Sequence, residues 1–366
     1  MKPCGDLKLT MSSLFLHCRP GFEGECAAEI LDLAAARGFS GFCQAKPESA
    51  FVIFQAHGAQ ATPELHARLP FSDVIFARQW FVLTYRNDGL PMTDRMTPLL
   101  EQAHALNMPV SDIFLETPDT NGGKALSPLC RALRRPMEEG LSGDNHRDVR
   151  AAADAVRLHV CFLSGTAACL GYALPANSAP WPMGIPRLKF PRGAPSRSTL
   201  KLEEAFLHFL TSEEREQFLR PGMHAVDLGA APGGWTWQLV RRHLRVTAVD
   251  NGQLAPQLLE SGVVEHVRAD GFRFRPAKPV AWMVCDIVEQ PLRVAELAGQ
   301  WLARGWCEHA IFNLKLPMKK RYQEVRRCLA HIDGLLREAG VAYTMVCKQL
   351  YHDREEVTVY LRRRKL

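Results

Sequence analysis

The pattern of apolar and polar positions changes several times along the chain. Up to about residue 174, short apolar runs alternate with stretches whose apolar residues recur every three or four positions, as in Cys26, Ile30 and Leu33. Such alternation predicts a mixture of strands and amphipathic helices. We expect strands at Leu14–Cys18, Phe51–Phe54, Val74–Tyr85 and Asp112–Glu116, helices at Phe22–Arg37, Pro63–Leu69, Asp94–Leu106 and Lys124–Leu141, and a hairpin of Arg157–Leu163 with Ala168–Leu174.

Residues 175–198 have a different composition. Proline recurs there too often for a regular helix, so the segment predicts a semi-extended linker. Its prolines are Pro175, Pro180, Pro182, Pro186, Pro191 and Pro195.

From Thr199 onward the pattern is typical of a doubly wound α/β domain. The first helix is expected to bury a stripe made of Leu202, Ala205, Phe206, Phe209 and Leu210. The expected strands are Ala225–Asp227, Val246–Val249, Met283–Asp286 and Ala310–Leu314, followed by a hairpin of Tyr343–Gln349 with Glu356–Leu361. We therefore divide the chain into two α+β subdomains (1–90 and 91–175), a Pro-rich basic linker (176–198) and an α/β domain (199–366).

The composition narrows the class of protein. The chain is 47% apolar and 23% charged, which is ordinary for a globular protein. No apolar run approaches the roughly 18–20 residues of a membrane-spanning helix, and Met1–Ser13 lacks a signal-peptide core. The 11 cysteines include no C-x-x-C pair, so we expect free, mostly buried thiols and no metal site. A cytoplasmic location follows as the expectation.

Charge is distributed unevenly between the two halves of the chain. Residues 1–175 carry 16 Lys/Arg and 19 Asp/Glu, whereas residues 176–366 carry 29 and 20. The excess lies in Arg187–Lys201 and in Asn313–Leu366. A one-sided basic half indicates a polyanionic partner, most commonly a nucleic acid.

The strongest local motif is the glycine-rich turn after the strand that ends at Asp227. The text from Asp227 to Trp235 reads Asp-Leu-Gly-Ala-Ala-Pro-Gly-Gly-Trp. Glycines let a ligand approach the backbone closely, and the helix that follows offers free N–H groups. The G-x-G-x-x-G spacing of a dinucleotide site is missing, and an acid precedes the first glycine. The motif therefore favours S-adenosylmethionine over a pyrophosphate.

Two further acids follow the next strands. Asp250 ends the second strand, where a carboxylate can accept both ribose hydroxyls of an adenosine, and Asp270 follows the third strand, within reach of an adenine amino group. Each could instead cap a turn. Three acids in order behind a glycine turn favour cofactor binding.

Asp286 and Lys315 close two apolar strands at the same expected sheet edge, where open α/β folds bind ligands. We expect burial and a second lysine, Lys201, to lower the pKa of Lys315, so that a neutral amine takes a proton from a ribose 2′-hydroxyl. Glu356, which opens the last strand, is expected to orient one of the lysines.

This set of motifs resembles the FtsJ-like, Rossmann-type RNA 2′-O-methyltransferases over roughly Ser196 to Leu361. The hallmark of that family is a Lys-Asp-Lys-Glu tetrad, which falls here on Lys201, Asp286, Lys315 and Glu356. Glu355 is a weaker candidate for the last position.

The resemblance extends over almost the whole chain to the bacterial 23S rRNA cytidine 2′-O-methyltransferases. It is carried by Cys18-Arg-Pro-Gly-Phe-Glu23, Phe76-Ala-Arg-Gln-Trp-Phe81, Met183-Gly-Ile-Pro-Arg-Leu-Lys-Phe190 and Gln349-Leu-Tyr-His-Asp-Arg-Glu-Glu356. It implies a ferredoxin-like subdomain at 1–90, a THUMP RNA-binding subdomain at 91–175 and a Rossmann-like methyltransferase domain at 199–366. The implied proton acceptor is Lys315, and the implied substrate is a cytidine ribose in the peptidyl-transferase region of 23S rRNA. The implied contacts to S-adenosyl-L-methionine are Ser198, Ala231, Pro232, Gly233, Gly234, Asp250, Asp270 and Asp286.

Other functions fit the residues less well. Cytosine C5 methylation needs a nucleophilic cysteine after Pro or Thr, but Cys285 follows Val284. Amine methylation usually shows an Asn/Asp-Pro-Pro-Tyr/Phe loop, and Asp286-Ile-Val-Glu289 lacks one. A small-molecule methyltransferase fits the charge asymmetry poorly. The remaining alternative is a non-catalytic rRNA-binding or ribosome-assembly factor, although an intact tetrad speaks against it.

The expected partner is 23S rRNA, naked or at an early stage of assembly, with no membrane and no stable protein partner. Phosphate contacts are expected from the linker and from the segment after Lys315, and in the N-terminal half from one helix. These cations are Arg187, Lys189, Arg192 and Arg197, then Lys319, Lys320 and Arg321, and finally Arg131, Arg134 and Arg135.

Overall fold

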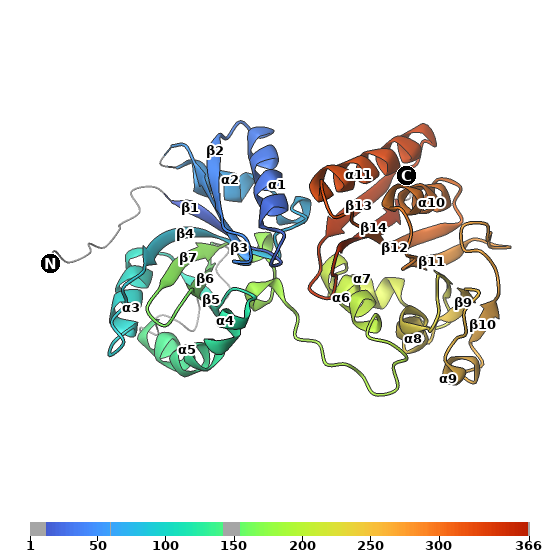
Figure 1. Ribbon diagram of the computed structural model, residues 1–366, viewed down its shortest axis with the longest axis horizontal. Coiled ribbons are helices and arrows are strands. Elements are labelled where there is room, and N and C mark those ends of the chain that lie inside the picture. Colours follow the sequence, from blue (N-terminus) through green and yellow to red (C-terminus); the bar gives the residue numbers. More distant parts are fainter. Residues whose placement is uncertain (1–11, 59, 142–153, 365–366) are drawn as a thin grey trace. The chain divides into compact units, whose positions relative to one another are not determined.

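The computed structural model describes residues 12–58, 60–141 and 154–364. The chain forms two compact units, Met1–Pro186 and Arg187–Leu366 (Figure 1). Each unit is built around its own seven-stranded sheet.

The first unit has strand order β2-β3-β1-β4-β7-β6-β5. The pairing is antiparallel except between β5 and β6. Its strands are β1 (Ser13–His17), β2 (Gly41–Ala45), β3 (Phe51–Ala56), β4 (Gln79–Asn87), β5 (Val110–Glu116), β6 (Val156–Phe162) and β7 (Ala168–Ala173). Its α-helices are α1 (Glu23–Ala35), α2 (Ala61–Arg68), α3 (Met96–Ala105), α4 (Asn121–Ala125) and α5 (Ser127–Leu141).

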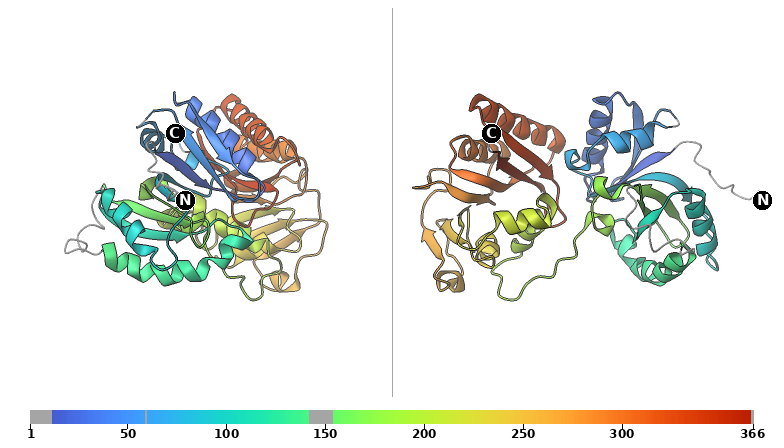
Figure 2. Two further views of the ribbon diagram at one scale, coloured as in Figure 1. Left: turned by 60° about the vertical axis from the view of Figure 1, so that its left-hand side comes forward. Right: turned by 180° about the vertical axis from the view of Figure 1, so that it is seen from behind.

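A single sheet therefore runs through both predicted N-terminal subdomains. β4 joins the two halves by pairing with β1 on one side and with β7 on the other (Figure 2). The core crosses the same junction, because Phe81 on β4 stacks on Phe15 of β1 and on His159 of β6 at centroid distances of 4.8 and 4.9 Å. Aromatic stacking of this kind adds to the apolar area that the junction buries.

Three local features differ from the expectations. The strand predicted at Val74–Tyr85 begins only at Gln79, because the backbone N–H groups of Ile75 and Phe76 donate to the buried carboxylate of Glu29 instead of to a strand. β2 was not predicted, and its mostly exposed side chains explain the missing apolar signal. The first half of the predicted linker packs onto the first unit.

This packing depends on Asn177. Its side chain accepts from the N–H of Phe71 and donates to the carbonyls of His66 and Leu69. Two short 3₁₀ turns, Pro175–Asn177 and Pro182–Gly184, replace the semi-extended backbone expected there.

The second unit has strand order β10-β9-β8-β11-β12-β14-β13. The first five strands are parallel, and β14 pairs antiparallel with both β12 and β13. Its strands are β8 (His224–Leu228), β9 (Arg245–Val249), β10 (Val264–Val267), β11 (Val280–Cys285), β12 (Cys307–Lys315), β13 (Tyr343–Lys348) and β14 (Glu356–Arg363). Its α-helices are α6 (Thr199–Phe209), α7 (Ser212–Phe218), α8 (Gly234–Val240), α9 (Pro256–Leu259), α10 (Pro291–Ala303) and α11 (Arg321–Glu338).

Helices cover both faces of this sheet, with α10 and α11 on one side and α6 and α8 on the other (Figure 1). The stripe predicted on α6 is buried except for Phe209, which is partly buried. Phe206 packs edge-on against Trp282 of β11, with the ring centroids 5.6 Å apart. The Rossmann-like arrangement predicted for this part of the chain is confirmed.

Two general expectations can be compared with the described residues. The cysteines among them are free, and all except Cys43 are buried, as predicted. Within residues 12–58, 60–141 and 154–364, no helix has the length and apolarity that crossing a membrane requires.

Candidate active site

The carboxyl ends of the five parallel strands form one edge of the second sheet. In the register of the sheet, Val267, Val249, Leu228, Cys285 and Phe312 follow one another across the strands. The residues that emerge just beyond this row therefore meet along one edge. They include Asp270, Asp250, the turn that starts at Gly229, Asp286 and Lys315.

Lys201, Asp286, Lys315 and Glu356 form a closed ring of ion pairs at this edge. Lys315 Nζ lies 2.6 Å from Asp286 Oδ1 and also contacts Glu356 Oε2. Lys201 Nζ lies 3.3 Å from Asp286 Oδ2 and also contacts Glu356 Oε1. Each lysine thus bridges both carboxylates, so the structure brings together all four members of the predicted tetrad.

Secondary structure accounts for the ring. Lys315 is the last residue of β12 and lies directly opposite Glu356, the first residue of β14, in the antiparallel register. Asp286 follows the neighbouring strand β11, and Lys201 lies in the first turn of α6. Two positive and two negative charges balance, and their side chains are between 5% and 23% exposed. Partial burial makes these contacts stronger than ion pairs on an open surface.

The pKa of Lys315 does not follow the prediction. Burial by itself lowers it, but the carboxylates of Asp286 and Glu356 outweigh burial and raise the pKa well above its ordinary value. The prediction was wrong because it placed a second lysine beside Lys315 without the two carboxylates that lie between the lysines. The two carboxylates therefore favour the protonated form of Lys315.

The geometry also distinguishes the two candidate glutamates. Glu356 contacts both lysines and is 4% exposed. The side chain of Glu355 is 60% exposed and pairs with Arg321 at 2.8 Å, outside the ring. Glu356 is therefore the candidate that the structure favours.

One further residue at the ring was not predicted. The Asn313 side chain is fully buried on β12 and donates from Nδ2 to Asp286 Oδ1 at 3.0 Å. The signal in the sequence was an amide in the otherwise apolar run Ile311-Phe-Asn-Leu, because a buried amide requires a hydrogen-bonding partner.

The glycine turn lies next to the ring, between β8 and α8. Gly229 and Gly233 have φ of 76° and 111°, a left-handed region that favours glycine. A Cβ on Gly234 would lie 2.2 Å from Ser198 Oγ and 2.3 Å from Ser196 Oγ, so this turn packs tightly against the start of α6. The peptide bond between Ala231 and Pro232 is cis. The predicted contact residues from Ser198 and from 231–234 are thus brought together.

The carboxylates of Asp250 and Asp270, which follow β9 and β10, both accept hydrogen bonds from the backbone of turns. Asp250 accepts from the N–H of Ala231 at 3.0 Å and of Gly252 at 2.7 Å, and Asp270 accepts from the N–H of Phe272 at 2.9 Å. A carboxylate has about four acceptor positions, so these contacts leave capacity for a ligand. Capping and ligand binding are therefore compatible here.

Asp227, the acid before the first glycine, is buried at the same edge. It accepts from the Thr236 hydroxyl at 2.6 Å, and burial raises its pKa to about 7. Among the described residues, no group of three His, Cys, Asp or Glu side chains is placed to hold a metal ion.

The expected RNA-contacting cations differ in their surroundings. Arg134 and Arg135 on α5 are each paired with a glutamate one turn away, Glu138 and Glu139, at 2.9 and 2.6 Å. Such pairs leave less charge for a phosphate. The cations at 187–197 and 319–320 are exposed: Arg187, Lys189, Arg192, Arg197, Lys319 and Lys320.

Two apolar side chains are exposed close to the ring in sequence. Val288, two residues after Asp286, is 85% exposed, and Met318, three residues after Lys315, is 92% exposed. They follow the neighbouring strands β11 and β12. Exposed apolar groups beside cations suit a partner that offers flat bases as well as phosphates.

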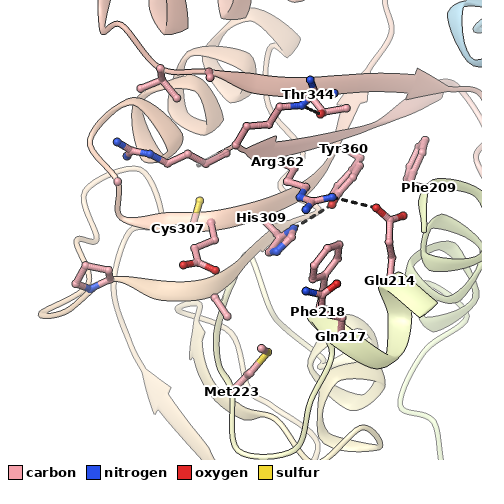
Figure 3. Close-up of a pocket in the computed structure, with 18 of the residues that line it drawn as sticks. Phe209, Glu214, Gln217, Phe218, Met223, Cys307, His309, Thr344, Tyr360 and Arg362 are labelled. Carbon is pink, nitrogen blue, oxygen red and sulfur yellow. Dashed lines mark hydrogen bonds and ion pairs between the residues drawn. The ribbon is translucent and has the colours of Figure 1, made fainter. Parts of the chain in front are cut away.

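A pocket of about 1040 Å³ opens at the opposite edge of the sheet, beside the amino ends of the parallel strands (Figure 3). Its wall includes Arg362, which pairs with Glu214 at 3.0 Å and covers the Phe218 ring, and His309, which bonds Tyr360 Oη at 3.0 Å. None of the predicted site residues lines this pocket.

Comparison with known proteins identifies the family. Residues 11–81 match the RlmM ferredoxin-like domain, 94–174 match the N-terminal region of ribosomal RNA large subunit methyltransferase M, and 194–360 match the FtsJ-like methyltransferase domain. The first and third matches confirm the expected ferredoxin-like and methyltransferase folds, whereas the THUMP assignment of the middle region stays a prediction.

Curated relatives agree over nearly the whole chain. Ribosomal RNA large subunit methyltransferase M of Methylococcus capsulatus is 56% identical over 350 residues, which cover 96% of this chain and 98% of the relative. The protein of the same name from Cellvibrio japonicus is 54% identical, covering 96% and 99%. This chain belongs to the ribosomal RNA large subunit methyltransferase M family and is an rRNA methyltransferase.

Proposed function

We propose that the chain transfers the methyl group of S-adenosylmethionine to the 2′-oxygen of a cytidine ribose in 23S rRNA, with Lys315 as the proton acceptor. The observation that carries this proposal is the ring of Lys201, Asp286, Lys315 and Glu356 at the carboxyl edge of the sheet. It places an amine beside the glycine turn. The choice of cytidine rests on the family resemblance alone.

The residues at this edge suit the cofactor. The turn at 231–234 lies at the N-terminus of α8, where free N–H groups can donate to a carboxylate, and Asp250 and Asp270 offer acceptors for ribose hydroxyls and an adenine amine. Asp286 completes the set next to Lys315. When bound, the cofactor supplies a methyl group on a positively charged sulfonium.

The protonated state of Lys315 has to change before it can accept a proton. The positive sulfonium would repel the ammonium of Lys315, as Lys201 does across the ring. Bound RNA would exclude water from the edge, and desolvation disfavours the charged form of the amine. Both effects lower the pKa of Lys315 in the loaded enzyme, and the released proton leaves to solvent before the edge closes.

The chemistry then requires only proximity and a general base. Neutral Lys315 would take the 2′-hydroxyl proton while the oxygen bonds to the methyl carbon, and the sulfur would leave as a neutral thioether. Holding the two reactants in line supplies much of the rate, and the base contributes about 10²–10⁴-fold. The exposed cations at 187–197 and 319–320 would bind phosphates, and Val288 and Met318 would contact bases.

The test uses 23S rRNA from cells that lack the gene, incubated with the full chain and methyl-labelled S-adenosylmethionine. Mass spectrometry after nuclease digestion locates the label. One methyl on a cytidine 2′-oxygen is the expected result. Label on a base overturns the role of Lys315, and label on another ribose overturns the cytidine assignment.

A further inference from the structure

A buried carboxylate, Glu204, lies one turn after Lys201 on α6. Its side chain is inaccessible to solvent, yet it contacts the segment that leads into β14. Oε1 accepts from the N–H of Tyr351 at 2.7 Å, and Oε2 accepts from the N–H of His352 at 2.9 Å and contacts the His352 ring at Nδ1 at 2.5 Å. One helix therefore carries a ring lysine and also holds the loop that ends at Glu356.

A second buried carboxyl group, that of Asp353, stabilises the same loop from inside. Asp353 is fully buried, accepts from the N–H of Leu350 at 2.9 Å and lies 3.0 Å from Thr358 Oγ1. Burial and the nearby charge of Glu356 raise the pKa of Asp353 well above its ordinary value. Thr358 on β14 thus connects the inside of the loop to the strand that Glu356 begins.

The carboxylate of Asp286 determines the orientation of Asn313, because it accepts hydrogen bonds and so faces the amide nitrogen. Asn313 Nδ2 donates to Asp286 Oδ1 at 3.0 Å. The amide oxygen then faces Thr358, whose hydroxyl donates to Asn313 Oδ1 at 2.8 Å. A chain of hydrogen bonds thus runs from Asp353 through Thr358 and Asn313 to the ring.

We propose that Asn313 and Glu204 are positioning residues for methyl transfer: Asn313 orients Asp286 and shares its negative charge, and Glu204 holds the loop that places Glu356 against both lysines. This inference rests on the proposed function of the ring. Both side chains are buried, so each acts through a ring carboxylate rather than on the substrate.

The expected electrostatic effect of Asn313 has a definite sign. Its N–H group withdraws part of the charge of Asp286, so Asp286 attracts the proton of Lys315 less strongly. Without that donor the pKa of Lys315 rises further, and less neutral amine is present at a given pH. A purely structural role for Asn313 predicts no such shift.

The first test replaces Asn313 with Leu, which has a similar volume and leaves no polar group of its own unsatisfied. We expect single-turnover methylation to fall about 10- to 100-fold, by analogy with the loss of a hydrogen bond to a metal-ligating side chain. The Kd for S-adenosylmethionine and for 23S rRNA should stay within about threefold, and the pH–rate profile should move to higher pH. A folded N313L enzyme with an unchanged rate and pH profile overturns the role of Asn313.

The second test compares two neighbouring glutamates on α6. Glu204→Gln keeps an acceptor for one backbone N–H group but loses the other, so a partial loss of turnover is expected, and Glu204→Ala should lose more. Glu203→Gln is the matched control, because Glu203 pairs with Arg242 at 2.6 Å outside the ring and should keep the wild-type rate. If Glu204→Ala does not fold, the Glu204→Gln variant alone tests the role of Glu204. Equal rates for Glu203→Gln and Glu204→Gln overturn that role.

The order of the experiments separates the two proposals. The wild-type enzyme is assayed first, and label on a ribose 2′-oxygen establishes the ring chemistry before any variant is made. An unaffected N313L or E204Q enzyme then overturns only the positioning roles. Label on a base in the wild type overturns the proposed function and with it the basis of this inference.

Discussion

Replacing Lys315 with Met removes the amine and keeps an unbranched side chain of similar volume. Lys201 contacts both Asp286 and Glu356, so neither carboxylate is left without a cation. The stability cost should therefore stay below the 3–5 kcal/mol typical of a buried ion pair that loses one partner; we expect about 1–2 kcal/mol. The free energy of unfolding, measured in urea, checks this value.

The rate should fall much further than the stability. A positioned general base contributes about 10²–10⁴-fold, equivalent to about 3–5 kcal/mol of activation free energy. The assay is single-turnover transfer of labelled methyl to 23S rRNA at saturating enzyme, with the Kd of S-adenosylmethionine measured separately by calorimetry. That Kd should change no more than a few-fold.

The pH dependence of the rate tests which protonation state of Lys315 is active. The neutral amine is the active form, so the wild-type rate should rise about tenfold per pH unit wherever the pH lies below the pKa of Lys315 in the loaded enzyme. The residual rate of Lys315→Met should lose this slope. Lys319→Met is the matched control, since Lys319 is exposed outside the ring and its loss should affect RNA binding rather than the chemical step. A Lys315→Met enzyme that keeps a tenth or more of the wild-type single-turnover rate would refute the assignment.

Three other expectations can be measured separately. Changing Lys319 and Lys320 to Ser should weaken rRNA binding and reduce the slope of log K against log salt by about one per lysine that contacts a phosphate; an unchanged slope in a binding titration would remove both from the interface. Gly234→Ala should abolish measurable S-adenosylmethionine binding in calorimetry, because the new Cβ would lie 2.2 Å from Ser198 Oγ, and wild-type affinity would show that the turn can shift. Burial lowers the pKa of His66 from 6.5 to about 4, so the unfolded state binds this proton first as the pH falls. His66 alone should therefore cost the wild type about 3 kcal/mol of stability between pH 7 and pH 4, and His66→Met should lose that much less in urea titrations; equal losses would contradict the assignment.

Much of the second unit could be predicted from its sequence, because parallel strands are apolar runs and the candidate site acids directly follow them. Asp286 and Lys315 were identifiable for this reason. The pKa of Lys315 was not, since it depends on which carboxylates face the amine. That information lies in the pairing of β12 with β14, which puts Glu356 opposite Lys315.

Other features were missed because local sequence carries little signal for them. Glu204 resembles any charged residue on an amphipathic helix, and only the tertiary structure shows it buried against Tyr351 and His352. The edge strand Gly41–Ala45 is mostly exposed, so it lacks the alternation that identifies a half-buried strand. Asn177 fixes the first part of the linker through contacts more than 100 residues away in sequence.

The shared sheet of the first unit has a consequence for how this protein can be dissected. Separate family models match residues 11–81 and 94–174, which suggests that the chain could be truncated between them. A cut there followed by removal of the second half would leave β4 with a bare edge from Val82 to Asn87, and an unpaired edge of this kind recruits other chains into aggregates. The smallest portable module is therefore the whole stretch up to Pro186. Recombination between relatives should respect that boundary, because an exchange inside the sheet would have to reproduce the register of β4 with β7 and the stacking of Phe81 on His159 at the same time.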